Sequence, residues 1–377
     1  MNIKNIISAI AVSGTLLAGL SGCEAEYQPD YERVYIGEAS SSRYVKMQVE
    51  GTAATETKLT IKLVKPQSAP VTVTLGSDPA LIDEYNVQNG ANYLPLPAEY
   101  ITMAETAVIQ PGESSIVVPI TIAPYETPND EQYALPLAIS SVEGPVSASV
   151  SSSNLTYLLD KPLIQWVPQM TWRCMPKSDP DKLWKVQTKD WSIECLNWKD
   201  NYGINNQAII SMVATKEIYI RFGDTSIPYN SLQVKYGGSQ VNNPTLFTTS
   251  RWDHLAFIYS QGAKELSIYI NGVKTGKLDI DTETIELNGI SIHSSGQAYN
   301  YGNSRMAQLR IWSRALNESE LNANMYSAVS PNAEGLVAYY KMNEGEGDTY
   351  RDCTANGRDI VCLYAPQWIE GQRFDGK

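Results

Sequence analysis

Aromatic and amide side chains gather in two polar segments of this sequence, and they are the residues best suited to chemistry. Trp198 is followed by Lys-Asp-Asn-Tyr-Gly, and residues 292–303 hold two tyrosines among serine, asparagine and glycine. Aromatic rings stack on the apolar faces of sugar rings and bury about 150–250 Å² each, while amides and carboxylates bind hydroxyl groups. The sequence therefore predicts a sugar-binding site with the candidate residues Trp198, Asp200, Asn201, Tyr202, Tyr229, Asn243, His293, Tyr299 and Tyr301.

Each candidate also has a structural interpretation. Trp198 ends an alternating strand pattern, so it is either a site residue or a core tryptophan at a strand end. The segments around Tyr229, Asn243 and Tyr299 are either functional loops or solvated turns, since Asn and Gly favour turns. Because both polar segments border strands of one predicted sandwich, we expect the loop after Trp198 to meet residues 299–301 and to form the site there.

Residues for catalysis are scarce. Of the two histidines, His254 lies in a strand pattern that favours a structural role, and His293 has no evident nucleophile beside it. A retaining glycosidase on a β-sandwich places two carboxylates close together, typically as Glu-x-Asp-x-x-Glu, and this pattern is absent from the sequence. Asp279, Asp281 and Glu283 match part of a chitinase motif, which we interpret as coincidence. We expect a non-enzymatic protein without a cofactor, with calcium bound by this acidic trio as the alternative.

The amino-terminal residues predict export and lipid anchoring. Lys4 precedes an apolar run at residues 6–20, and Leu-Ser-Gly then leads to Cys23, as in a secretory signal with a lipobox. Cleavage before Cys23 gives an amino-terminal thiol that carries several acyl chains, enough for a stable anchor. Residues 24–26, Glu-Ala-Glu, are similar to the acidic tag that directs Bacteroidetes lipoproteins to the outer face of the outer membrane. We therefore expect attachment to the cell surface through Cys23.

The net charge of the chain limits its possible partners, and its length indicates the number of domains. The chain has 29 Lys and Arg against 41 Asp and Glu, a formal charge of −12, and loss of residues 1–22 removes one positive charge and gives −13. Such a surface repels nucleic acid and anionic lipid, so we expect no polyanion partner. The remaining chain of about 355 residues is too long for one compact core and predicts two domains.

Four cysteines follow the anchor residue, and in an exported chain they allow three pairings as two disulfides. The spacing favours a bond between Cys353 and Cys362, and then one between Cys174 and Cys195. Because Cys195 alternates with apolar neighbours, a buried free thiol is the other interpretation.

Short strands dominate the sequence. Alternation between odd and even positions places residues 191, 193 and 195 on one face of a strand and residues 194, 196 and 198 on the other. Regular strand patterns around Trp252 and Trp312 predict core tryptophans, and Asn271-Gly272 predicts a type I′ hairpin turn. Period-two alternation without sustained helical periodicity is clearest at residues 44–49, 58–64, 71–75 and 116–122.

Helices and a domain boundary complete the pattern. Two helical pieces are predicted, at residues 79–86 and at residues 318–322, where Asn317 provides the cap. We place the domain boundary between the serine-rich residues 147–153 and Trp166, because all eight tryptophans lie from Trp166 onward. The two halves are expected to do different work.

Five segments of the first half carry a family resemblance when they are taken in order. They are Pro-Val-Thr-Val-Thr-Leu at 70–75, Leu-Ile-Asp-Glu-Tyr-Asn at 81–86, Tyr-Leu-Pro-Leu-Pro-Ala-Glu-Tyr at 93–100, Ile-Gln-Pro-Gly at 109–112 and Tyr-Ala-Leu-Pro-Leu at 133–137. Together they resemble the Bacteroidetes domain of unknown function 1735. This resemblance implies an immunoglobulin-like spacer and platform of the kind found in front of glycan-binding or glycan-degrading modules in surface lipoproteins.

Five segments of the second half carry another resemblance, and they lie at residues 191–195, 252–256, 266–272, 308–316 and 335–345. They are similar to laminin-G domains of the concanavalin A-like type. The resemblance implies a jelly-roll β-sandwich whose function lies in its loops and one concave face. Leu196 departs from the family, whose members often carry tryptophan there, so no particular binding surface is transferred.

The sequence as a whole predicts an all-β chain. We expect a signal peptide at residues 1–22, an anchor and linker at 23–29, an immunoglobulin-like sandwich at 30–160 and a concanavalin A-like jelly-roll sandwich at 161–377. The expected function is non-catalytic binding of an oligo- or polysaccharide beside importer components and separate hydrolases of a polysaccharide-utilisation system. A structural or adhesive protein-binding lipoprotein is the alternative, followed by a glycoside hydrolase.

Overall fold

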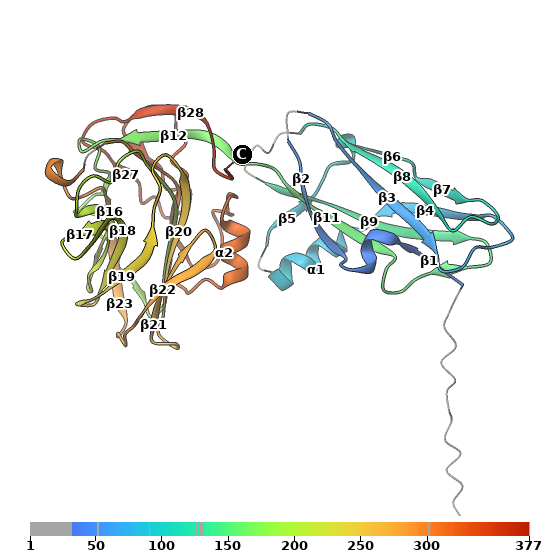
Figure 1. Cartoon of the computed structure of the whole chain (residues 1–377), viewed down its shortest axis with the longest axis horizontal. Coiled ribbons are helices and arrows are strands. Elements are labelled where there is room, and N and C mark those ends of the chain that lie inside the picture. The colour runs from blue at the N-terminus through green and yellow to red at the C-terminus, as the bar shows by residue number, and fades with distance from the viewer. Residues whose placement is uncertain are drawn as a thin grey trace, which may run out of the picture.

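Two β-sandwiches follow one another along the chain, as Figure 1 shows. The computed structural model describes residues 32–50, 53–89, 91–125, 127, 131–300 and 302–376, so the predicted signal peptide and Cys23 lie outside it. Among the described residues, no helix has the length and apolar character needed to cross a bilayer. The succession of sandwiches confirms the predicted all-β fold class.

The first sandwich consists of sheets I and II. Sheet I has the order β10 (Ser147–Ala148), β1 (Arg33–Ile36), β3 (Thr55–Leu63), β8 (Ser115–Ile122) and β6 (Ile101–Met103). Sheet II has the order β2 (Tyr44–Gln48), β11 (Asn154–Asp160), β9 (Gln132–Glu143), β4 (Val71–Ser77) and β7 (Thr106–Ile109), with β5 (Tyr93–Pro95) paired to β9. Four of these strands, β2, β3, β4 and β8, occupy the segments in which alternation predicted them.

Alternating side chains build the core of the first sandwich. Leu59, Ile61 and Leu63 of β3 point inward and are buried, as are Val71 and Val73 of β4. The residues between them in sequence are polar and face solvent, which is the period-two pattern of a sheet with one buried face.

Two α-helices are present in the described chain, and both fall where capping and periodicity predicted them. α1 (Ala80–Asn89) buries Leu81 and Ile82 against the first sandwich, while α2 (Glu318–Asn324) belongs to the second. Asn317 Oδ1 accepts the backbone N–H of Glu320 at 3.0 Å, and the Glu320 carboxylate accepts the N–H of Asn317 at 2.9 Å, which forms a capping box. Single 3₁₀ turns occur at η1 (Gly37–Ser40), η2 (Ala98–Tyr100) and η3 (Gln297–Tyr299).

The second sandwich consists of sheets III and IV. Sheet III has the order β22 (Val273–Asp279), β21 (Glu265–Ile270), β20 (Trp252–Ser260), β15 (Trp191–Lys199), β24 (Ser304–Trp312), β12 (Ile164–Met170) and β28 (Gln367–Arg373), with β25 (Leu336–Tyr340) paired to β24. Sheet IV has the order β19 (Ser239–Leu246), β18 (Ile227–Tyr236), β17 (Ile218–Asp224), β16 (Gln207–Ala214), β23 (Ile285–Ile292), β13 (Lys177–Ser178), β27 (Ile360–Val361) and β26 (Thr349–Tyr350), with β14 (Val186–Thr188) paired to β23.

Tight turns and tryptophans of this sandwich agree with the sequence pattern. Asn271 and Gly272 join β21 to β22 with φ of 50° and 77°, the two left-handed residues of the predicted type I′ turn. Trp312 is buried, as predicted. Trp252 is partly buried, and its ring centroid lies 4.7 Å from that of Phe374.

β15 is buried on both faces, and its side chains divide as the alternation predicted. Trp191, Ile193 and Cys195 enter the main core between sheets III and IV. Leu196 belongs to a separate cluster on the outer side of sheet III, where Glu194 is also completely buried. A carboxylate placed there needs partners, because an unpaired buried charge is very costly.

Glu194 has four partners on the outer side of sheet III, beneath α2. Its Oε1 accepts hydrogen bonds of 3.2 Å from Arg310 Nη1, Trp312 Nε1 and Asn324 Nδ2, and its Oε2 lies 3.3 Å from His254 Nε2. Burial raises the pKa of Glu194, but the Arg310 charge and the His254 contact outweigh it and hold this pKa below the ordinary 4.5. His254 therefore has the structural role that its strand pattern predicted.

The cysteines differ from the favoured pairings. None of the four is bonded in the structure, and Cys195 is a fully buried thiol, as the alternative interpretation had it. Cys362 lies beside Cys174 rather than beside Cys353, with the two thiols within hydrogen-bonding reach. The favoured disulfides were chosen because their cysteines are close in sequence. Cys174 and Cys362 are close in space instead, because β13 and β27 are neighbours in sheet IV despite their separation along the chain.

We predict that Glu194→Ala lowers the free energy of unfolding by about 3–5 kcal/mol, because Arg310 is left as an uncompensated buried charge. Urea denaturation monitored by tryptophan fluorescence measures the loss. Glu265→Ala, which removes a partly exposed carboxylate paired with Lys274, is the matched control and should cost about 1 kcal/mol or less. Equal losses in the two variants would contradict a special role for Glu194.

Candidate functional site

The outer face of sheet IV carries a continuous row of mostly polar side chains. Strand register aligns one residue from each of seven neighbouring strands, and alternation turns these residues away from the core. With neighbouring strands about 4.8 Å apart, the row spans about 29 Å. Its members are Gln240, Lys235, Tyr219, Ser211, Ser291, Lys177 and Val361.

A hydrogen-bonded network fixes the neighbouring positions of this face. Arg221 donates to Gln233 Oε1 through Nε at 2.9 Å and Nη2 at 2.6 Å, and to Asn206 Oδ1 through Nη1 at 2.6 Å. The same guanidinium lies 2.8 Å from Asp224, and Gln233 Nε2 donates to Asn242 Oδ1 at 2.9 Å. The network presents amide and charged groups in fixed positions.

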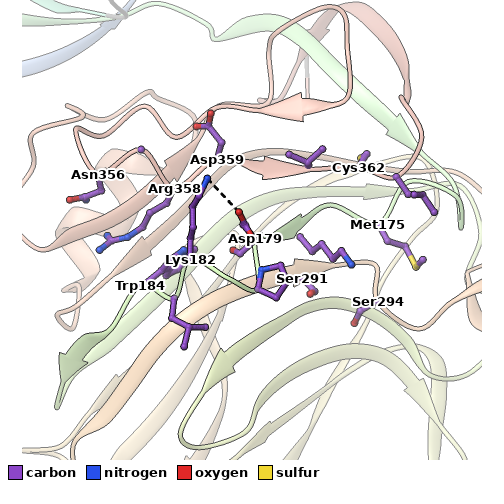
Figure 2. A pocket seen from close by; sticks show the side chains of 17 residues that line it. Met175, Asp179, Lys182, Trp184, Ser291, Ser294, Asn356, Arg358, Asp359 and Cys362 are labelled. Carbon is purple, nitrogen blue, oxygen red and sulfur yellow. Dashed lines mark ion pairs between the residues drawn. The ribbon is translucent and has the colours of Figure 1, made fainter.

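A cavity of about 940 Å³ opens where the row ends at β13 and β27. Residues 179, 180 and 182–184 form one wall and residues 356–359 another, and Ser291 of β23 and Ser294 of the following loop also line the cavity (Figure 2). The cavity is therefore built from segments that lie far apart in sequence and meet at one edge of sheet IV.

Apolar groups line part of this cavity. Trp184 is largely buried in the main core, and the Arg358 guanidinium carbon lies 5.5 Å from its ring centroid. Leu183, Val361 and Leu363 also line the cavity, and each is exposed, with Leu363 at 73%. Exposed aliphatic side chains around a concave surface are typical of a binding site.

Polar groups with free hydrogen-bonding capacity lie beside these apolar ones. Within the described chain, the Ser291 and Ser294 hydroxyls and the Lys177 ammonium group make no side-chain hydrogen bond to other residues. Lys182 and Asp179 form an ion pair of 3.4 Å within one wall of the cavity (Figure 2). The Asp181 backbone N–H and Lys182 hold the pKa of Asp179 below its ordinary value, so this carboxylate remains charged.

The carboxylate of Asp352 holds one wall in place. Its Oδ1 accepts the backbone N–H groups of Tyr339 at 3.1 Å and Thr354 at 3.0 Å, and its Oδ2 accepts that of Arg358 at 3.0 Å. Asp359 Oδ1 in turn accepts the N–H of Asp352 at 2.9 Å. Such bracing preorganises the loop, which reduces the ordering cost of binding.

The loop after Trp198 contacts the end of the predicted segment 292–303, next to the expected residues 299–301. Asp200 accepts the backbone N–H of Asn303 at 2.8 Å through Oδ1 and the side-chain amide of Asn303 at 2.7 Å through Oδ2. Gly302 has φ of 74°, and a side chain there would collide with Asp200. The carboxylate is thus committed to holding the loops together, and Tyr301 lies outside the described residues.

Trp198 does not line this cavity, and its predicted contact with sugar stays a prediction. It lies on the outer side of sheet III, whereas the cavity lies on the outer side of sheet IV, so the sandwich separates them. The Arg305 guanidinium carbon is 4.1 Å from the Trp198 ring centroid. Since Gln169 and Gln372 hold this guanidinium, one face of the indole is already occupied.

Three more candidates are buried, so they are corrected from sugar contacts to structural residues. Tyr202 packs with Phe222 and Phe247 at centroid distances of 4.9 and 6.5 Å. Asn243 Nδ2 donates to Thr275 Oγ1 at 2.8 Å between two sheets. His293 is enclosed at the end of the core, where its backbone carbonyl accepts Asn300 Nδ2 at 2.8 Å.

Three other candidate residues lie on the surface of the protein. Tyr229 of β18 is 47% exposed and Tyr299 of η3 is 37% exposed, while the exposed Asn201 uses its side-chain oxygen to accept the N–H of Gly203. The predicted segment 292–303 reaches the cavity through Ser294.

Sequence reasoning missed the walls of the cavity. Residues 179–184 combine a proline-containing acidic turn with a tryptophan, and residues 356–359 read Asn-Gly-Arg-Asp. Both have the loop chemistry that singled out other segments. Their proximity, however, depends on pairing between β13 and β27, which are two residues long and have no alternation to detect.

The acidic trio considered for calcium lies in and after β22. Asp281 Oδ2 is 2.7 Å from Lys264 Nζ, and Asp279 Oδ1 is 2.9 Å from Lys277 Nζ. In the described residues, no group of three or more acidic, histidine or cysteine side chains is arranged to hold a metal ion. Calcium at Asp279, Asp281 and Glu283 remains an untested expectation.

We predict stability effects of very different size for two tyrosines that the sequence analysis placed in one candidate site. Tyr202→Ala should lower the free energy of unfolding by about 3–5 kcal/mol because it empties an aromatic core site. Tyr229→Ala should change it by about 0.5 kcal/mol or less because the ring is exposed. Thermal and urea denaturation of both variants measure the free energy of unfolding. Similar losses in the two variants would contradict the difference in burial between Tyr202 and Tyr229.

We also predict an acid sensitivity that depends on His293. Burial and the nearby Lys199 charge lower the pKa of His293 from 6.5 to about 3, so the unfolded chain binds a proton more readily as pH falls below 6.5. Between pH 7 and pH 4, wild type should therefore lose about 2–3 kcal/mol more stability than His293→Asn. Asparagine suits the φ of 52° at this position. Parallel pH–stability curves would contradict this origin.

Comparison with known proteins supports the order of the two folds. Residues 27–146 match a family model described as an N-terminal domain, and residues 180–322 match the model of the concanavalin A-like lectin/glucanases superfamily. A search of curated proteins finds no similar sequence.

Solved structures extend this comparison to nearly the whole chain. A candidate carbohydrate-binding protein from Bacteroides ovatus is 22% identical, with a TM-score of 0.61, and the match covers 92% of this chain and 100% of that one. EndoBT-3987 from Bacteroides thetaiotaomicron, solved with Man5GlcNAc product, is 20% identical over 34% of this chain and 30% of that one, and its TM-score of 0.30 supports no conclusion. The first match shows that this two-sandwich architecture occurs in a protein from Bacteroides ovatus, and the second half of the chain has the concanavalin A-like fold.

Proposed function

We propose that this chain binds glycans without cleaving them and that the site is the cavity at the edge of sheet IV. The observation that carries the proposal is the joint presence, in one open cavity of about 940 Å³, of exposed aliphatic side chains and hydroxyl and ammonium groups with free hydrogen-bonding capacity. A sugar ring presents apolar C–H faces and polar hydroxyl edges, so it needs both kinds of group at once.

The surrounding face suits a ligand longer than one sugar. The polar row of sheet IV leads directly into the cavity through Ser291 and Lys177. A chain of sugar units lying across the strands would keep hydrogen-bonding partners along its length. We infer an oligo- or polysaccharide ligand rather than a free monosaccharide.

Charge within the cavity favours binding over hydrolysis. A glycosidase needs a carboxylic acid whose pKa is raised so that it can protonate the leaving group. Asp179 in the cavity has the opposite shift, since its pKa is lowered by the Asp181 N–H and by Lys182. The candidate carbohydrate-binding protein from Bacteroides ovatus, which shares the architecture, is consistent with this proposal.

The cellular part of the proposal rests on the sequence. The apolar run and Cys23 support export and lipid anchoring, and the acidic residues 24–26 support the outer surface of the outer membrane. We propose that the chain captures glycans there for importer components and separate hydrolases of the same utilisation system. Labelling cells with radioactive palmitate, with Cys23→Ala as the control, tests the anchor.

We predict that Lys177→Ala and Leu363→Ala each weaken glycan binding by about 5- to 20-fold, which corresponds to about 1–2 kcal/mol. Isothermal titration against a panel of plant and host oligosaccharides measures the affinity. Lys185→Ala and Val273→Ala are matched controls, because both residues are exposed and neither lines the cavity. Melting temperatures of all four variants should stay close to that of wild type.

Three outcomes would overturn parts of this proposal. Affinity that falls only in Trp198→Ala would move the site to sheet III. Absence of binding to every glycan in the panel would favour the adhesive, protein-binding alternative. Release of reducing sugar that disappears in Asp179→Asn or Asp359→Asn would show a hydrolase.

A further inference from the structure

Two cysteines outside the proposed sugar contacts lie together at the edge of the cavity. Cys174 and Cys362 belong to the same hydrophobic core and have thiols within hydrogen-bonding reach of each other. The strands beside them are paired, since Lys177 of β13 is the register partner of Val361 in β27. The pairing keeps the two segments side by side next to the thiol contact.

We propose that Cys174 and Cys362 form a disulfide that closes one wall of the cavity. The bond would join the turn after β12 to the end of β27, so it would link two segments 188 positions apart. Both ends border the candidate site, because Met175 and Lys177 line the cavity together with Cys362.

The reaction is a two-step exchange with a disulfide-carrying oxidant, either a small thiol disulfide or a thiol oxidoreductase. The Cys174 thiolate attacks one sulfur of the oxidant, which forms a mixed disulfide and releases one thiolate. The Cys362 sulfur, as it loses its proton, then attacks Cys174 Sγ and releases the second thiolate. Two protein thiols are oxidised, one oxidant disulfide is reduced, and two protons pass to the released thiolates or to water.

The surroundings of the pair favour this order of steps. The hydrogen bond with Cys362 lowers the pKa of Cys174, which favours the thiolate that the first step needs. Cys174 also lines a second cavity, of about 280 Å³, beside Tyr364. Cys362 Sγ also lies 3.4 Å from the Tyr350 hydroxyl, which holds its side chain at the contact.

The remaining cysteines lie at sheet III, away from the Cys174–Cys362 pair at sheet IV. Cys195 is completely buried, and burial raises its pKa. Cys353 packs against a different cluster, on the outer side of sheet III. These two thiols therefore serve as internal controls for a bond that is specific to the Cys174–Cys362 pair.

The disulfide proposal rests on the proposed export in one respect, because export would bring the chain into an oxidising compartment. The test replaces that compartment with an added oxidant. The purified full chain in detergent is incubated with oxidised glutathione, free thiols are alkylated after unfolding, and peptides are mapped by mass spectrometry without reduction. We expect one linked peptide pair joining Cys174 to Cys362, with Cys195 and Cys353 alkylated. Because the linked loop is long, oxidation should raise the melting temperature by several degrees, about 5–10 °C.

Matched variants make the result specific. Cys353→Ser should keep both the linked peptides and the rise in melting temperature, and Cys174→Ser should lose both. Alkylation of Cys174 and Cys362, retention of glutathione on either one, or a link from Cys362 to Cys353 would each overturn the proposal. None of these readouts depends on sugar binding, so failure of the disulfide and failure of the glycan-binding proposal are distinguishable.

Discussion

The buried carboxylate of Glu194 is the interaction around which the second sandwich is organised. β15 lies in the middle of sheet III and is covered on both sides, so a charged side chain there must find all its partners inside the protein. Arg310 and Trp312 from β24, His254 from β20 and Asn324 at the end of α2 supply them. The carboxylate thus ties three elements to one strand, and α2 stays on the outer face of sheet III.

Because other elements cover the outer face of sheet III, the outer face of sheet IV is the one available to a ligand. With sheet III packed beneath α2 and the segment around Phe374, the second sandwich retains one broad polar face, on sheet IV. Short strands at one edge of that sheet bring two braced loops together, and the cavity forms between them. The candidate site is therefore a consequence of how the opposite sheet is buried.

The sequence predicted the features that depend on local patterns. Alternation located β2, β3, β4 and β8, the Asn271-Gly272 pair identified a hairpin, and Asn317 with Glu320 identified a helix start. These signals reside in a few neighbouring residues, so no knowledge of distant contacts is needed.

The site was harder to predict because it depends on distant pairing. Trp198, Tyr202 and His293 have the side chains of a sugar site, but whether each faces solvent depends on sheet packing that composition does not encode. Tyr202 enters the core because Phe222 and Phe247 leave room for its ring, and Trp198 is covered by an arginine from β24. The cavity walls come from segments about 180 positions apart, joined by strands too short to leave a pattern.

The short passage between the two sandwiches has a mechanical consequence. Only residues 161–163 separate β11 from β12, a reach of about 10 Å when fully extended. Lys161 Nζ donates to the Tyr125 carbonyl at 2.7 Å, and Arg373 of the second sandwich lies 3.4 Å from Glu50 of the first. Figure 1 places β16, β17 and β18 on the side of the second sandwich that is turned away from the first. Because the linker is this short, the two sandwiches have little freedom to move relative to each other. The orientation of the first sandwich therefore also determines the direction in which the outer face of sheet IV points.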